Sequence, residues 1–168
     1  MKGIVIMVAG FKNSGKTTLI TCLIRDLTRY GFKIAVFKHI YHSDFKVDYE
    51  GKDTWRYIEA GANASIAVSK GRLYINEYLD EYPDLNELIE RYRASYDIVI
   101  LEGFEGILGS RNDIYKIIIG RDERDLNTIS SKLSEPILGM IQVEDINKIK
   151  CMEDYHNILN KILNILRR

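Results

Sequence analysis

Hydrophobic residues along the chain alternate between two spacings, one typical of buried strands and one typical of helices. Short apolar runs rich in β-branched residues predict strands buried on both faces, and they occupy residues 4–9, 33–38, 97–101, 115–119 and 137–141. After the first run, apolar residues recur every three or four positions, as at Leu19, Leu23 and Leu27, which predicts an amphipathic helix ending near Gly31. Strands that alternate with helices indicate a mostly parallel sheet covered on both faces.

The middle of the chain departs from this alternation. Two short runs, at 65–68 and 72–75, flank the dipeptide Lys70-Gly71 and predict a β-hairpin. Further helices are expected around residues 54–60, from residue 85 onward, and over 158–166. Because no repeat, low-complexity tract or Pro/Gly/Ser-rich linker interrupts the chain, residues 1–168 are expected to form a single domain.

Composition and charge exclude several classes of protein. Lys plus Arg and Asp plus Glu are both 24, so the formal net charge is zero, which argues against a general nucleic-acid-binding protein. The two cysteines, Cys22 and Cys151, have no disulfide or zinc-site spacing and fit a reducing compartment. No run approaches the ~20 apolar residues of a membrane span. We therefore expect a soluble, cytoplasmic protein without a membrane partner.

Residues 10–17, GFKNSGKT, match the phosphate-loop pattern G-x-x-x-x-G-K-[ST] between the first strand and the first helix. Glycines let such a loop wrap closely, so that backbone N–H groups and the helix dipole converge on phosphate oxygens. The motif in this context predicts an α/β, three-layer P-loop NTPase fold with a mostly parallel central sheet and a β-hairpin extension. The expected nucleotide-binding residues are Gly10, Asn13, Ser14, Gly15, Lys16, Thr17 and Thr18.

Three side chains of this motif have distinct expected roles. Lys16 is expected to reach the β- and γ-phosphates, and the Thr17 hydroxyl is expected to ligate Mg²⁺. Thr18 is expected to contact the α-phosphate, as this position does in P-loop proteins generally. A nucleoside triphosphate with Mg²⁺ is therefore the expected ligand.

Carboxylates after two of the strands are candidates for the metal site and for catalysis. Glu102 ends a strand, at the sheet edge where ligands of parallel sheets bind, so it can hold Mg²⁺ through water or orient a nucleophile. Asp48 and Asp53 follow the second strand at the same edge; Asp53 is well placed as a helix N-cap, so Asp48 is the preferred candidate. An exposed loop glutamate at Glu102 and ordinary turn chemistry at Asp48 are the alternatives.

Two histidines, His39 and His42, lie just past the second strand, and their spacing is no recognisable metal signature. They are either polar lining of the site or ordinary loop residues, and the second interpretation is favoured.

Four segments carry a resemblance to a known family: GFKNSGKTTL from Gly10, KHIYH from Lys38, DYEGKDTWRYIEAGA from Asp48, and LEGFEG from Leu101. In this order and spacing, the chain resembles the molybdopterin-guanine dinucleotide biosynthesis protein B (MobB) family. The phosphate loop is shared by many proteins, whereas the GKDTWR and AGA residues with the downstream EGF are far more selective. A weaker similarity follows at KIIIGR from Lys116.

The resemblance implies a cytoplasmic, homodimeric GTP-binding protein with weak Mg²⁺-dependent hydrolysis. It implies a partner, the guanylyltransferase that attaches GMP to molybdopterin, and makes a molybdopterin-type ligand a further candidate. Asp48 and Glu102 fall at the family's acidic positions near the metal. The expected catalytic residues are thus Lys16, Glu102 and Asp48, and the expected metal-binding residues are Thr17, Glu102 and Asp48.

The chain also departs from the family pattern. Tyr41 stands where the family often has a further histidine, and Glu105 replaces a lysine beside the site. No N-K-x-D motif for reading guanine is present, and Asp145 is the nearest candidate for that role. The preference for GTP over ATP therefore follows from the resemblance alone.

Two other functions fit the same residues. An ATP-dependent small-molecule kinase is the main alternative, with residues 111–124 as a cationic lid, although the apolar KIII run within them reads as a strand. A nucleotide-dependent structural module is the other, with the hairpin supplying a dimer edge through strand pairing. A weak GTPase acting as an adapter remains the preferred interpretation, since no water-positioning Gln or arginine finger stands out.

Overall fold

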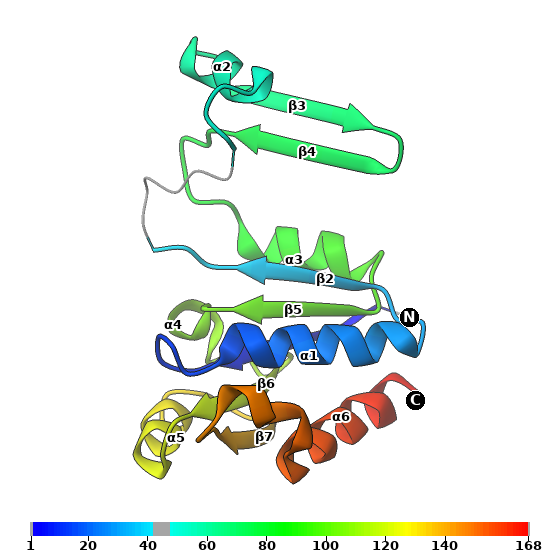
Figure 1. The fold of residues 1–168 in the computed structure, drawn as a ribbon, viewed down its shortest axis with the longest axis vertical. Helices are drawn as coiled ribbons and strands as arrows, with labels where there is room; N and C mark the ends of the chain where they lie inside the picture. Colours follow the sequence, from blue (N-terminus) through cyan, green and yellow to red (C-terminus); the bar gives the residue numbers. More distant parts are fainter. Residues whose placement is uncertain (1, 42–47, 168) are drawn as a thin grey trace. The chain divides into compact units, whose positions relative to one another are not determined.

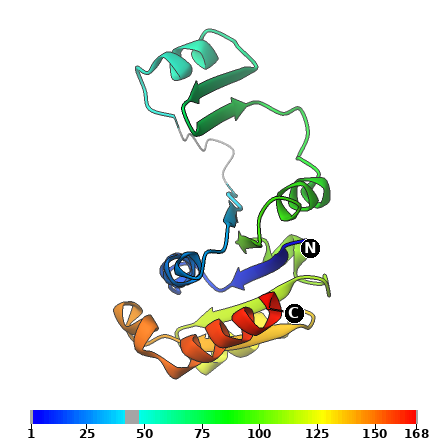
Figure 2. The same cartoon turned by 90° about the vertical axis from the view of Figure 1, so that its right-hand side faces the viewer.

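The computed structural model describes residues 2–41 and 48–167, and it divides the chain into two compact units (Figures 1 and 2). The first unit comprises Met1–His39 and Asn86–Arg168, and the second comprises Ile40–Leu85. The second unit is therefore inserted into the sequence of the first. The prediction of one compact domain over residues 1–168 stays a prediction.

The described part of the first unit is built on a five-stranded sheet in the order β2-β5-β1-β6-β7. All neighbouring strands are parallel, which confirms the predicted α/β class. The strands are β1 (Ile4–Ala9), β2 (Ile34–Lys38), β5 (Ile98–Glu102), β6 (Tyr115–Gly120) and β7 (Ile137–Gln142). Strand β1 lies at the centre, so the loop that follows it leaves the sheet beside the ends of β5 and β6.

Helices cover both faces of this sheet and complete the three layers. They are α1 (Lys16–Arg29), α3 (Leu85–Arg93), α4 (Glu105–Leu108), α5 (Glu123–Ser130) and α6 (Glu153–Leu166), with the 3₁₀ helix η1 (Ile146–Cys151) before α6. Figure 2 shows α1 and α3 on opposite sides of the sheet. Along β6, Ile117 and Ile119 join the core with α1 and α6, while Ile118 joins the core with α5. The period of two in a strand buried on both faces explains this division.

The second unit contains α2 (Asp53–Glu59) and an antiparallel pair of strands, β3 (Ala64–Ser69) and β4 (Arg72–Glu77). The predicted hairpin is confirmed, with the turn at Lys70-Gly71 and a positive φ of 81° at Gly71. The expected N-cap role of Asp53 is wrong: Lys52 is the N-cap of α2, and Asp53 is its first helical residue. There its charge still favours the positive end of the helix dipole.

A buried lysine lies at the edge of the sheet where the parallel strands begin. Lys116 at the start of β6 has no exposed surface, and burial lowers its pKa. Its ammonium donates to the carbonyl oxygen of Arg111, to the Ser134 hydroxyl at 3.4 Å and to the Glu135 carbonyl at 3.3 Å. The charge is thus accommodated by oxygen atoms of two loops.

No described helix has the length and apolar character needed to cross a membrane.

Candidate functional site

The predicted phosphate loop joins β1 to α1 and adopts backbone conformations suited to a tight wrap. Asn13 and Gly15 have positive φ angles of 64° and 95°. A Cβ atom on Gly10 would lie 2.5 Å from the Ile119 carbonyl oxygen and 2.6 Å from Ser14 Oγ, so a larger residue does not fit there without movement. The first and second glycines of the motif are therefore required for different reasons, one for space and the other for its left-handed conformation.

Lys16 folds back over the loop. Its Nζ donates to the carbonyl oxygens of Gly10 at 2.6 Å and Phe11 at 2.8 Å. Burial lowers the pKa of Lys16, although the carboxylates of Glu105 and Glu102 act in the opposite direction. The ammonium is thus held at the mouth of the loop by neutral oxygen atoms, and a phosphate oxygen is a stronger acceptor for it than either carbonyl.

Thr17 and Glu102 are brought together from positions 85 residues apart. Glu102 is the last residue of β5 and is only 8% exposed. Its Oε1 accepts a hydrogen bond from Thr17 Oγ1 at 3.1 Å. A hydroxyl and a carboxylate at this distance are the oxygen donors that Mg²⁺ takes alongside phosphates and water. The residues present therefore fit a Mg²⁺ ion bound with a nucleotide.

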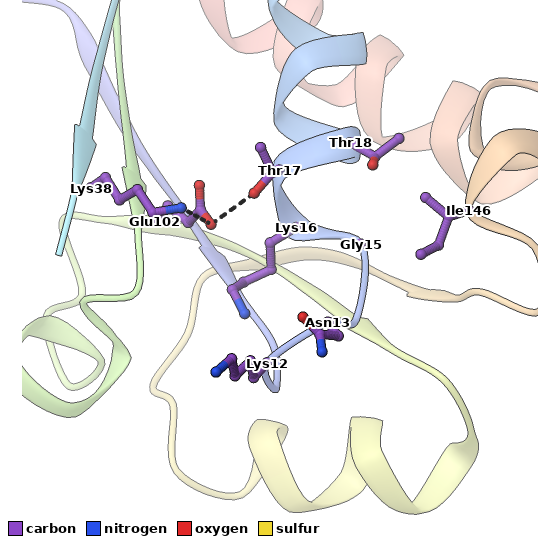
Figure 3. Close-up of a pocket in the computed structure, with 9 residues that line it drawn as sticks. All are labelled: Lys12, Asn13, Gly15, Lys16, Thr17, Thr18, Lys38, Glu102 and Ile146. Atoms are coloured by element: carbon purple, nitrogen blue, oxygen red, sulfur yellow. Dashed lines mark hydrogen bonds and ion pairs between the residues drawn. The ribbon is translucent and has the colours of Figure 1, made fainter. Parts of the chain in front are cut away.

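A third charged group, Lys38, completes this cluster. Lys38 ends β2, and the strand register places it opposite Glu102. Its Nζ lies 3.2 Å from the same Oε1 that accepts from Thr17 (Figure 3). The sequence interpretation did not select Lys38, because a lysine at a strand end is usually a solvated charge and only the neighbour relation of β2 and β5 reveals its contact.

These groups line a cavity of about 430 Å³ at the carboxyl edge of the sheet. The described lining residues are Lys12, Asn13, Gly15, Lys16, Thr17, Thr18, Lys38, Glu102 and Ile146. Lysines outnumber carboxylates among them, which suits a polyanion such as a triphosphate. Ile146 supplies an apolar side to the cavity, and it was not among the predicted site residues (Figure 3).

The 3₁₀ helix η1, which carries Ile146, is fixed against α1 by a polar cluster. Asp26 of α1 accepts hydrogen bonds from Lys150 Nζ at 2.9 Å and from the Tyr155 hydroxyl at 2.5 Å. Burial opposes ionisation of Asp26, but the hydrogen bonds from Tyr155 and Lys150 outweigh it, so its pKa lies below the ordinary value. Ile146 of η1 lies near the phosphate loop, since a Cβ on Gly15 would lie 3.6 Å from Ile146 Cγ1.

The remaining predicted positions fall in different places. Asp48 lies in the second unit, where its Oδ1 accepts from the backbone N–H of Tyr49 at 2.9 Å, and its metal-binding and catalytic roles stay predictions. The backbone N–H of His39 donates to the Glu102 carbonyl at 2.9 Å, which continues the β2–β5 ladder. His42 lies outside the described residues. Asp145 caps η1 by accepting from the N–H of Asn147 at 3.0 Å.

The segment considered as a kinase lid is not a mobile loop. Its middle forms β6, which pairs with β1 and β7 inside the sheet. Arg111, at the other end of β6, forms a bidentate pair with Asp113 at 2.5 and 2.9 Å. None of the three arginines of the segment, Arg111, Arg121 and Arg124, is among the described residues that line the cavity.

Comparisons with known proteins find similarity in both sequence and fold. The family model described as molybdopterin guanine dinucleotide synthesis protein B matches residues 5–142. The molybdopterin-guanine dinucleotide biosynthesis adapter protein of Escherichia coli is 30% identical over 162 residues, covering 88% of this chain and 87% of that protein. The Haemophilus influenzae adapter protein is 35% identical over 117 residues, covering 69% of this chain and 62% of that protein. The crystal structure of Bacillus subtilis MobB is 29% identical with a TM-score of 0.65, covering 83% of this chain and 79% of that one.

Proposed function

The chain belongs to the molybdopterin guanine dinucleotide synthesis protein B (MobB) family, and from this membership we propose that it is a GTP-binding adapter of molybdopterin-guanine dinucleotide formation. In this role it binds GTP with Mg²⁺, hydrolyses it slowly, and acts with a guanylyltransferase in the cytoplasm. The relatives named above are adapter proteins of that biosynthesis.

The observation that carries nucleotide binding is the convergence of Lys16, Thr17 and Glu102 on one cavity. Thr17 Oγ1 and the Glu102 carboxylate would hold Mg²⁺, which would supply positive charge beside the phosphates when bound. Lys16 would exchange its two carbonyl acceptors for β- and γ-phosphate oxygens. Loop N–H groups and the N-terminus of α1 orient the phosphates.

Slow hydrolysis follows from what surrounds Glu102. Its carboxylate can orient a water molecule near the terminal phosphate, directly or through the metal's water shell. The described lining residues of the cavity include lysines but neither glutamine nor arginine. Asp48 stays a predicted candidate for the same task. A protein that hydrolyses GTP slowly stays in the GTP-bound state for longer, which suits it to act on a partner enzyme.

Base selection is proposed to involve η1. Ile146 gives the cavity an apolar side on which a purine ring can pack. The Asp145 carboxylate is already engaged as the η1 cap, with Lys148 Nζ 3.8 Å away. Reading of guanine by Asp145 would therefore require it to give up this cap, and the preference for GTP rests on family membership.

A homodimer is proposed through the hairpin of the second unit. Ile66 pairs with Ile75, and Val68 pairs with Leu73, so these side chains share one face of the hairpin. All of them are between 52% and 77% exposed. A contiguous aliphatic face of this kind is stabilised when a second apolar surface covers it. A second copy of the chain offers the same surface by symmetry.

Titration calorimetry tests the proposed function directly. GTP and ATP are each titrated into the purified protein with Mg²⁺, with Lys16→Ala as the variant and Lys12→Ala as a control that removes a cavity lysine without touching the loop carbonyls. We expect a preference for GTP that Lys16→Ala abolishes and Lys12→Ala only weakens. A preference for ATP would instead favour the kinase and prompt a search for its acceptor.

Partnership with the guanylyltransferase is tested in the same framework. The purified enzyme is passed over immobilised protein with GTP, with GDP and without nucleotide. Capture that depends on GTP and is lost in Lys16→Ala supports the adapter role. Equal capture in every state would show that nucleotide does not control the association.

A further inference from the structure

Lys38 occupies a place in the cavity that a bound metal would need. Its ammonium contacts Glu102 Oε1 at 3.2 Å, and Thr17 Oγ1 contacts that oxygen at 3.1 Å. We propose that Lys38 is an internal counter-cation, which occupies Glu102 in the nucleotide-free protein and must withdraw before a divalent metal can bind. This inference rests on the proposed Mg²⁺ site and adds a residue that controls access to it.

The backbone fixes this arrangement. Lys38 and Glu102 are register partners on neighbouring parallel strands, and Val8 of β1 continues the same row. Side chains of register partners leave the same face of a sheet. A lysine here therefore reaches the carboxylate beside it without any change of main chain.

Electrostatics explains why Glu102 needs a cation beside it. Glu102 is nearly buried, and a buried carboxylate without a compensating charge is destabilising. The Lys38 side chain is 57% exposed, so its ammonium can move into solvent or toward an anion. Lys16 also interacts electrostatically with Glu102, but its ammonium is hydrogen-bonded to two carbonyl oxygens of the loop.

The consequence is that metal and nucleotide should enter together. A bare divalent cation must displace the ammonium and gains only one carboxylate and one hydroxyl from the described cluster. A metal–triphosphate complex brings anionic oxygen atoms that offer Lys38 a new partner as it leaves Glu102. Lys38 thereby disfavours metal alone and permits metal with nucleotide.

Binding of Mn²⁺ to the nucleotide-free 168-residue chain tests the proposal, with free Mn²⁺ measured by electron paramagnetic resonance. We expect Lys38→Met to bind Mn²⁺ about three- to tenfold more tightly than the unchanged protein, the range for losing one partly screened neighbouring charge. Lys12→Met removes a charge from the same cavity but not from Glu102, and its gain should stay below about twofold. Lys38→Arg, which keeps the charge, should bind as weakly as the unchanged protein.

Several results would overturn the proposal. Unchanged, weaker or undetectable Mn²⁺ binding to Lys38→Met would do so, as would an equal gain in Lys12→Met. Retention of the gain in the double variant Lys38→Met/Glu102→Gln would place the metal elsewhere. Lys38→Gln serves as a second variant, and thermal melts verify that each protein is folded.

The assay contains no nucleotide, so its outcome is separate from that of the proposed function. If the unchanged protein fails to bind GTP in calorimetry, GTP binding is refuted while the competition between Lys38 and metal still stands or falls on the Mn²⁺ data. If GTP binds but the variants do not differ in Mn²⁺ affinity, only the counter-cation role is lost.

Discussion

Replacing Tyr155 by Phe removes a single oxygen atom from the cluster that joins α1, η1 and α6. The Tyr155 hydroxyl donates a hydrogen bond to Asp26 Oδ2 at 2.5 Å, and the Tyr155 side chain is fully buried in the main core. Phenylalanine keeps the ring packing, so the change isolates the hydrogen bond. Asp26 keeps its hydrogen bond from Lys150 at 2.9 Å. The carboxylate therefore loses one hydrogen-bond partner but still has another.

The expected cost follows from the type of hydrogen bond. A bond to a charged acceptor contributes about 1.5–3 kcal/mol, and the remaining Lys150 contact places this one at about 1.5–2.5 kcal/mol. In a chain of 168 residues each kcal/mol corresponds to about 2–4 °C. Tyr155→Phe should thus lower the melting temperature by about 3–10 °C.

The loss should also depend on pH in a defined way. Hydrogen bonds from Tyr155 and Lys150 outweigh burial and hold the pKa of Asp26 below its ordinary 3.8, so this stabilisation is full above that value and is lost as pH falls through the folded-state pKa. Burial, with the hydrogen bond to Asp26, raises the pKa of Tyr155 above its ordinary 10.0. The contribution of Tyr155 to the free energy of unfolding is therefore complete below pH 10.0 and declines above it. The difference between the two proteins is therefore greatest between these limits.

Urea unfolding of the unchanged protein and of Tyr155→Phe, at pH values from well below 3.8 to above 10.0, measures the difference. Tyr30→Phe is the matched control, because the Tyr30 ring is exposed at the end of α1 and its change should stay within about 0.5 kcal/mol. A Tyr155→Phe effect no larger than that of the control would refute the estimate. A large effect that stays constant across pH would instead assign the loss to packing.

Three further predictions concern the site and the dimer. Gly10→Ala should weaken GTP binding at least about tenfold, since its Cβ would lie 2.5 Å from the Ile119 carbonyl oxygen, while Gly106→Ala, which meets nothing within 4 Å, should leave calorimetric affinity unchanged. Glu102→Gln should reduce Mg²⁺-dependent GTP turnover more than GTP affinity, and equal losses in both would contradict its role. Val68→Glu should convert the proposed dimer to monomer in sedimentation, whereas an unchanged dimer would place the interface outside the hairpin.

The hydrophobic pattern was sufficient for the sheet and for most helices. The run at 4–9 became β1 with the same bounds, and the run predicted at 33–38 became β2 at Ile34–Lys38. Helices α4 and α5 were not predicted. Helix α4 is a single turn that includes Gly106. Helix α5 is amphipathic, but its eight residues include only two apolar ones, Leu126 and Ile129, which are too few to establish a helical period from the sequence.

The site was predictable as far as local sequence determines it. Lys16 and Thr17 are recognised because a contiguous motif carries their geometry. The contact of Lys38 with Glu102 depends on β2 lying beside β5 rather than beside β1, and strand order is not encoded in the period of either strand. Ile146 was not predicted for the same reason, since its position beside the phosphate loop depends on how η1 packs after β7.

The buried ammonium of Lys116 gives the molecule an internal standard for amine chemistry. An acylating reagent can reach the lysines of the cavity in the folded protein, and a bound triphosphate should shield Lys16 and Lys38 from it. Lys116 has no surface to offer until β6 opens. Mass spectrometry of one labelled sample would therefore report ligand occupancy at Lys16 and unfolding of the sheet at Lys116 as two separate readings.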